Sequence, residues 1–107
     1  MQTDRLKGNL DLLLLACVAR TPGHGYAIIA RLREQSAEAF DLPEGTVYPA
    51  LHQLEKAGLL TSTWVTEAGR KRKLYRLTDS GAKQLAAEER SWRSFTTAVG
   101  LVLGGEA

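Results

Sequence analysis

Residues 46–60, "TVYPALHQLEKAGLL", form the most informative stretch of this chain. Val47, Leu51 and Leu54 recur at the spacing of one face of a helix. The opposite side is polar, and it carries Pro49, His52, Gln53 and Lys56. The pattern predicts a helix with a polar side available for binding, although any amphipathic helix of a small domain can show the same pattern.

Pro49 falls near the start of this predicted helix. An N–H in the first helical turn has no intrahelical acceptor, so a proline there costs little if the helix begins near Thr46 and more if it begins near Pro43. Either start places Pro49 near the N-terminal end. That end is the one that a recognition helix directs at base edges.

A β-hairpin is predicted directly after this helix. Gly58 can take the left-handed conformation that ends helices, and "LLTSTWVT" (59–66) and "KRKLYRLT" (71–78) then alternate as strands around a turn at "EAGR". Five of the 14 basic residues lie in residues 70–76, which leaves nine to set against 12 acidic residues elsewhere. This concentration favours contact with a polyanion, although a charge run is more often a solvated face.

Three more helices complete the pattern. Asn9 can cap a first helix that runs through Val18, a second helix extends from about Tyr26 to Gln35, and Thr78 can cap a last helix that reaches about Val102. Turns at "TPGHG" and "SAEAFDLPEG" separate the first three helices, and His24 is interpreted as a structural turn residue.

The order helix, helix, helix, hairpin, helix is that of a winged helix-turn-helix. A helix fits the major groove of B-DNA, and a basic hairpin can reach the flanking phosphates. We therefore expect a mainly α protein with a small β-hairpin. Residues 1–78 would be the winged helix-turn-helix DNA-binding domain and residues 79–107 a long C-terminal dimerization helix, together forming one compact unit.

The last helix carries an apolar stripe. Leu85, Trp92 and Val99 recur every seven residues, and Phe95 and Val102 join them. A homodimer would bury this stripe, whereas the alternative is that it folds back on its own domain. Such dimers place two recognition helices about 34 Å apart, so the expected operator is an inverted repeat with half-sites roughly 10 base pairs apart.

Four stretches resemble the PadR-like family of transcriptional regulators. They are "KGNLDLLLLACVA" (7–19), "GHGYAIIARL" (23–32), "GTVYPALHQLEKAGLL" (45–60) and "GRKRKLYRLTDSG" (69–81). The resemblance implies a bacterial or archaeal DNA-binding repressor, usually a homodimer held by its C-terminal helix. It assigns DNA-binding roles to Thr46, Tyr48, Pro49, His52, Arg70, Lys71, Arg72 and Lys73. In this family Arg or Lys often stands where this chain has Gln53.

Two aromatic residues keep two interpretations each. Tyr48 can bond a phosphate or seal the edge of the core. Trp92 can line a small hydrophobic effector's pocket at the dimer interface, as an aromatic residue does in some family members, or it can simply pack there. A third, Trp64, on the first strand, is predicted to cover the hydrophobic core.

Other functions find little support in the sequence. Cys17 sits in an apolar run and is predicted to be a core residue, and His52 has no second ligand at helical spacing, so no metal or other cofactor is expected. No catalytic constellation is recognisable. The longest apolar run, residues 12–19, is too short to cross a membrane, and no signal peptide pattern opens the chain, so a cytoplasmic protein is expected. A winged helix that binds another protein is the alternative function.

Overall fold

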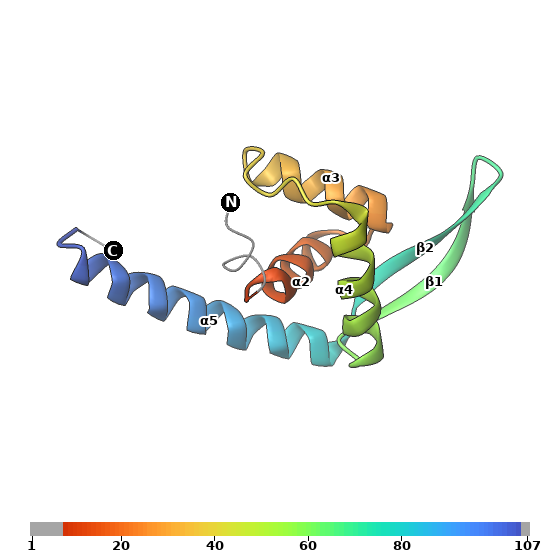
Figure 1. Cartoon of the computed structure of the whole chain (residues 1–107). Helices are drawn as coiled ribbons and strands as arrows, with labels where there is room; N and C mark the ends of the chain where they lie inside the picture. Colours follow the sequence, from red (N-terminus) through yellow and green to blue (C-terminus); the bar gives the residue numbers. More distant parts are fainter. Residues whose placement is uncertain (1–7, 106–107) are drawn as a thin grey trace.

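The computed structural model describes residues 8–105, which form four helices and one two-stranded hairpin (Figure 1). The elements, with the labels of Figure 1, are α2 (Leu10–Arg20), α3 (Gly25–Gln35), α4 (Glu44–Lys56), β1 (Leu60–Glu67), β2 (Arg70–Leu77) and α5 (Asp79–Val102). This order confirms the predicted winged helix-turn-helix. Residues 1–7 and 106–107, which the expected domains include, lie outside the described residues.

Helices α2, α3 and α4 pack around one hydrophobic core, with the root of the hairpin against them. The buried side chains are Leu14, Leu15, Cys17, Val18, Ile28, Leu32, Leu42, Val47, Leu51, Leu54, Leu60 and Tyr75. Burial raises the pKa of the Cys17 thiol, so this cysteine is an inert core residue, as predicted.

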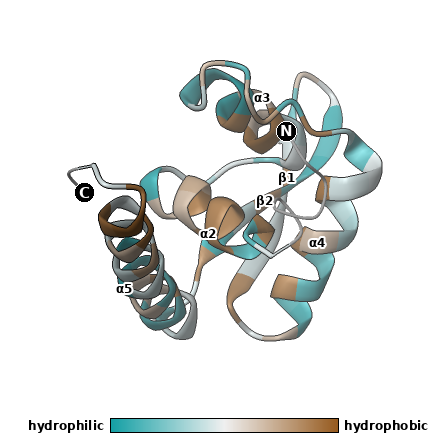
Figure 2. Ribbon diagram, turned by 60° about the vertical axis from the view of Figure 1, so that its left-hand side comes forward, coloured by the Kyte–Doolittle hydropathy of each residue, from teal (hydrophilic) through white to brown (hydrophobic). Residues whose placement is uncertain are grey.

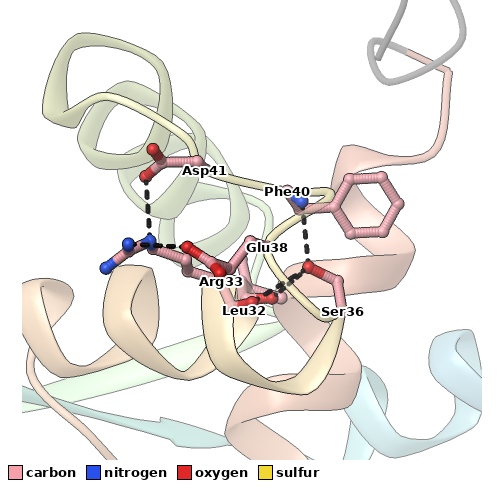
Figure 3. A network of polar contacts seen from close by, with 6 residues as sticks. All are labelled: Leu32, Arg33, Ser36, Glu38, Phe40 and Asp41. Atoms are coloured by element: carbon pink, nitrogen blue, oxygen red, sulfur yellow. Dashed lines mark hydrogen bonds and ion pairs between the residues drawn. The ribbon is translucent and has the colours of Figure 1, made fainter.

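Side chains fix the connection between α3 and α4 (Figure 3). The Ser36 hydroxyl accepts from the Phe40 N–H at 2.9 Å, and the Arg33 guanidinium donates to the Glu38 carboxylate at 2.8 Å. Arg33 also lies 3.9 Å from the Asp41 carboxylate. These contacts hold a turn in which Glu38 has a φ of 69°. The turn sets the angle between the two helices of the helix-turn-helix unit.

The hairpin has the shortest common turn. Glu67 pairs with Arg70, so only Ala68 and Gly69 connect the strands. Both have positive φ angles, 49° and 76°, as a type I′ turn requires. This turn matches the right-handed twist of the strands, which extend well beyond the helices (Figure 1).

The root of the hairpin is bonded to the α2–α3 loop. The Gly23 N–H donates to the Tyr75 carbonyl at 3.2 Å, and the Tyr75 N–H donates to the Gly23 carbonyl at 2.9 Å. The Tyr75 side chain is buried, and burial raises the pKa of its hydroxyl. We call the β1–β2 hairpin the wing. Its base is therefore held firmly to the core.

The predicted helix boundaries around the hairpin are confirmed. Gly58 has a φ of 80° directly after α4. The Thr78 hydroxyl accepts from the Gly81 N–H at 2.9 Å, which caps α5, and donates to the Gly58 carbonyl at 2.7 Å. The end of α4 is thus bonded to the start of α5.

Helix α5 begins against α2, and its C-terminal half projects away from the other helices (Figure 1). The molecule is accordingly elongated, with extents of 55 × 28 × 21 Å. The projecting end is markedly hydrophobic (Figure 2). Within residues 8–105, no helix has both the length and the apolar character needed to cross a membrane.

Candidate nucleic-acid interface

Helix α4 has one face in the core and one in solvent. Val47, Leu51 and Leu54 are buried, as the spacing predicts. The exposed side presents Pro49, His52, Gln53 and Lys56. Thr46 and Tyr48, at the two edges, are half-buried. The polar side chains predicted to contact DNA therefore share one continuous surface.

Pro49 lies further from the start of α4 than it would if the helix began near Thr46, where a proline would cost less. The helix begins at Glu44 with Pro43 at the N-cap position, so Pro49 is in the second turn. It has no N–H to donate to the Gly45 carbonyl, and a proline inside a helix costs about 3 kcal/mol. The remaining helix continues to Lys56 in spite of this loss.

The Tyr48 ring packs on the backbone of α3. A methyl group added at Gly25 would collide with this ring, so the glycine is required for the close approach of α4 to the start of α3. This contact favours the core-sealing role of Tyr48. The same ring borders the groove described below, so its other edge remains accessible.

The wing cations differ in their surroundings. Arg70 and Lys71 are exposed, and Arg72 is half-buried. Within residues 8–105, none of these three forms an ion pair. Their charges are therefore not neutralised by a carboxylate in the part of the chain that the structure describes.

Lys73 is already engaged. Its ammonium nitrogen lies 3.6 Å from Oε1 of Glu55 on α4 and 5.7 Å from the centre of the Trp64 ring. Oε2 of Glu55 accepts from the Ser62 hydroxyl at 2.6 Å. The Ser62 hydrogen bond, followed by the positive charge of Lys73, lowers the pKa of Glu55. Lys73 thus joins the wing to α4.

The prediction that Trp64 covers the core is wrong. Its side chain is 65% exposed, because β1 has already left the core at this position. Alternation along a strand indicates which face a residue shares, but not whether the core extends beneath it. Trp64 instead forms an aromatic wall on the concave side of the wing, beside Lys73.

An open groove of about 700 Å³ lies between the wing and the helices. Its lining is mainly aromatic, basic and histidine side chains from α3 with its N-cap residue, α4, β1 and β2: His24, Gly25, Tyr26, Glu44, Tyr48, His52, Trp64, Arg70, Lys71, Arg72, Lys73 and Tyr75. A smaller open groove adjoins it, lined by His52, Gln53, Glu55, Lys56 and Lys73. Together the two grooves bring the exposed face of α4 and the basic wing to the same side of the molecule.

His24 has a larger role than a turn residue. It is at the N-cap position of α3, and its side chain is only 14% exposed. Nε2 lies 2.6 Å from Oε1 of Glu67, and Nδ1 lies 3.2 Å from the Lys73 carbonyl. Both partners belong to the wing, and no local sequence signal connects residues more than 40 positions apart.

The apolar stripe of α5 divides into two parts. Leu85 packs against the core of its own domain. Trp92, Phe95, Val99 and Val102 are exposed, and the first two rings lie 6.2 Å apart. The stripe therefore leaves the core after Leu85, and its C-terminal part forms an uncovered apolar surface.

Metal-ligating residues are not gathered in the part of the chain that the structure describes, where no cluster of three or more His, Cys, Asp or Glu side chains could hold an ion.

A polar helix face beside a basic hairpin, on a three-helix core, defines a winged helix-turn-helix protein.

Comparison with known proteins agrees with this class. The chain matches the model of the transcriptional regulator PadR-like family over residues 14–87. It is 36% identical over 75 residues to a transcriptional regulator of Mycobacterium tuberculosis, covering 70% of this chain and 67% of that protein.

Solved structures are similar over nearly the whole chain. A transcriptional regulator of Clostridium thermocellum superposes with a TM-score of 0.85 at 26% identity, covering 94% of this chain and 95% of that one. A PadR-like transcriptional regulator of Bacillus cereus superposes with a TM-score of 0.84 at 31% identity, covering 97% and 100%. The chain belongs to the PadR-like family of transcriptional regulators, which confirms the resemblance seen in its sequence.

Proposed function

We propose that this PadR-like regulator is a homodimeric repressor that binds an inverted-repeat DNA operator. One observation carries the proposal: the exposed polar face of α4 lies on the same side of the molecule as three wing cations that form no ion pair within residues 8–105. Residues 1–78 would bind DNA, and residues 79–107 would dimerize. Repression itself is what the family resemblance implies.

In this proposal α4 enters the major groove. His52 and Gln53 are the candidates for base contacts, because both are exposed on α4 and both can donate and accept hydrogen bonds. Pro49 and Thr46 lie toward the N-terminal end of the helix, and Lys56 lies at its last turn. Arg70, Lys71 and Arg72 would neutralise phosphates beside the groove.

Dimerization would place two such surfaces on one face of the duplex. Phe95 and Val102 lie seven residues apart on one face of α5, and they are 62% and 86% exposed. Such exposure is unusual for large apolar side chains that share a helix face. An isologous pairing of two α5 helices would remove this surface from water.

A small hydrophobic effector is a further part of the proposal. Trp92 and Phe95 are the aromatic residues of the α5 stripe, and their tilted rings lie 6.2 Å apart. A ligand bound between two α5 helices would contact these rings, and it could alter the spacing of the two DNA-binding surfaces and so relieve repression.

The alternative, a module that binds another protein through the wing, makes a different prediction. The purified chain should be titrated with DNA from upstream of its own gene against random competitor, over a series of salt concentrations. Competitor-resistant binding with a steep salt dependence supports the DNA-binding function. Binding that is weak, or equal for both DNAs, supports the protein-binding alternative.

A further inference from the structure

Three carboxylates lie in or beside the candidate DNA-binding surface, which is unexpected for a surface that meets a polyanion. Glu44 and Glu55 are on α4, and Glu67 ends β1. Carboxylates near phosphates weaken binding by repulsion. Two of the three, however, are used within the protein, and their contacts explain why they lie there.

The first contact holds the wing to α4. Glu55 bonds the Ser62 hydroxyl of β1 with one oxygen and pairs with the Lys73 ammonium of β2 with the other, at 2.6 Å and 3.6 Å. A single carboxylate therefore touches both strands. The Glu55 and Lys73 side chains are about equally shielded, at 31% and 30% exposure, which limits the screening of this pair by solvent.

The second contact holds the wing to α3 from the other side of the groove. One nitrogen of His24 lies 2.6 Å from the Glu67 carboxylate, next to the hairpin turn, and the other lies 3.2 Å from the Lys73 carbonyl. We call these two contact sets the Glu55 clamp and the His24 clamp. Both act on Lys73, one on its side chain and one on its main chain.

The position of the clamps matters for the wing cations. Arg70, Lys71 and Arg72 lie between Glu67 and Lys73, so the segment that carries them is clamped at both of its ends. An isolated two-stranded hairpin has little stability of its own in water. Without the clamps, the cations would sample many positions relative to α4.

We infer that Glu55, Glu67 and His24 are positioning residues that set the angle of the wing to α4, so that its cations and α4 meet DNA together. This inference rests on the proposed DNA-binding function. Glu44 provides a matched control. It lines the larger groove, as His24 does, yet within residues 8–105 it forms no ion pair or side-chain hydrogen bond.

The test compares Glu44→Gln, Glu55→Gln and Glu67→Gln, since each removes one negative charge from the same surface. Electrostatics alone predicts that all three bind every DNA more tightly. We expect this only of Glu44→Gln. Glu55→Gln and Glu67→Gln should each weaken operator binding about fivefold, the loss that one partly exposed polar contact implies. Tighter binding by all three variants would overturn the inference.

Comparing His24→Gln in two backgrounds separates a positioning role from a direct contact with DNA. His24→Gln should weaken binding in the wild-type background but change it less than about twofold in Glu67→Gln, because both belong to one clamp. Equal effects of His24→Gln in both backgrounds would contradict the clamp. If a glutamine variant melts below the assay temperature, Ser62→Ala, which removes the hydrogen bond to Glu55 without a change of charge, replaces Glu55→Gln, and His24→Gln replaces Glu67→Gln.

A measurement without DNA keeps this inference distinct from the proposed function. Backbone order parameters of residues 65–72 should fall from about 0.85 toward 0.6 in Glu55→Gln and Glu67→Gln, and should stay unchanged in Glu44→Gln. If the wild type binds no specific DNA, the proposed function fails while the mobility still tests the clamps. Unchanged mobility in all three variants would overturn them.

Discussion

The ammonium nitrogen of Lys73, on the wing, lies 3.6 Å from Oε1 of Glu55, on α4. The two parts of the candidate DNA-binding surface are therefore in direct contact. Of the four wing cations that the sequence nominates, Lys73 is the one that forms an ion pair within residues 8–105. We propose that Arg70, Lys71 and Arg72 contact phosphates, and we expect the variants below to separate these roles.

Replacing Arg70, Lys71 and Arg72 with alanine should weaken binding to all DNA sequences alike. Each phosphate contact contributes about 0.9 to the slope of log affinity against log salt, so losing three should reduce the slope by about 2.7. Fluorescence anisotropy over a salt series measures this. Alanine at Lys83 and Arg90 of α5 is the control, and it should leave the slope unchanged. A triple variant with the wild-type slope would reject the wing as a phosphate contact.

Alanine at His52 or Gln53 should change which sequence is preferred. A good base contact is worth about 1–3 kcal/mol of discrimination, so operator binding should fall about tenfold while binding to random DNA stays nearly constant. Competition assays with both DNAs measure the ratio. Equal losses on both would assign these side chains to positioning on the backbone.

Glutamate at Trp92 or Val99 should yield a folded monomer. Each change puts a charge into the apolar surface that we propose two α5 helices bury. Leu101→Glu is a matched control, because at 100° per residue Leu101 lies on the opposite side of α5 from Trp92 and is 68% exposed. Sedimentation should give a monomer for the first two variants and a dimer for the third. A Val99→Glu protein that sediments as a dimer would refute this interface.

The Glu55 clamp should respond to acid. The pKa of Glu55 is lowered in the folded protein, first by the Ser62 hydrogen bond, so its stabilising effect is fully present above the ordinary value of about 4.3 and is lost as the pH falls through the lowered value. Urea unfolding at several pH values should show the wild type exceeding Glu55→Gln in stability near pH 7, with the difference shrinking toward pH 3. A difference that does not change with pH would contradict this linkage.

Much of the fold could be predicted because its signals are local. The apolar spacing of α4, the glycine after it and the capping threonine of α5 each act within a few residues, and the structure confirms them. The sequence does not fix the start of α4, because Pro43 and Thr46 are both compatible with helix entry. The choice of Glu44 as the first residue leaves Pro49 inside the helix.

The sequence indicates which residues belong to the candidate site, but it does not indicate which of them contact one another. Exposure of His52 and Arg70 follows from pattern and charge, whereas the contact of His24 with Glu67 depends on how the wing lies over α3. The exposure of Trp64 likewise depends on where β1 leaves the core, which the alternation along the strand does not indicate. Leu85 shares the periodicity of the α5 stripe, yet it packs in its own core because α2 still covers the first turns of that helix.

Pro49→Ala should stabilise the protein and weaken its function. Restoring the N–H to α4 should raise the free energy of unfolding by about 2 kcal/mol, since an interior proline costs about 3 and the freer unfolded chain returns up to about 1. Denaturant unfolding measures the gain, and operator binding measures any loss. A destabilised Pro49→Ala protein would mean that the proline ring makes contacts worth more than the missing hydrogen bond.

The most direct test of the central claim is selection of DNA by the purified protein from a random pool, followed by sequencing of the bound fraction. A dimer that inserts two α4 helices into one face of the duplex should enrich an inverted repeat with half-site centres about 10 base pairs apart. Trp92→Glu should lose this enrichment, while Leu101→Glu should keep it. Recovery of no common sequence, or of a single unrepeated site, would contradict a dimeric regulator that reads DNA through α4.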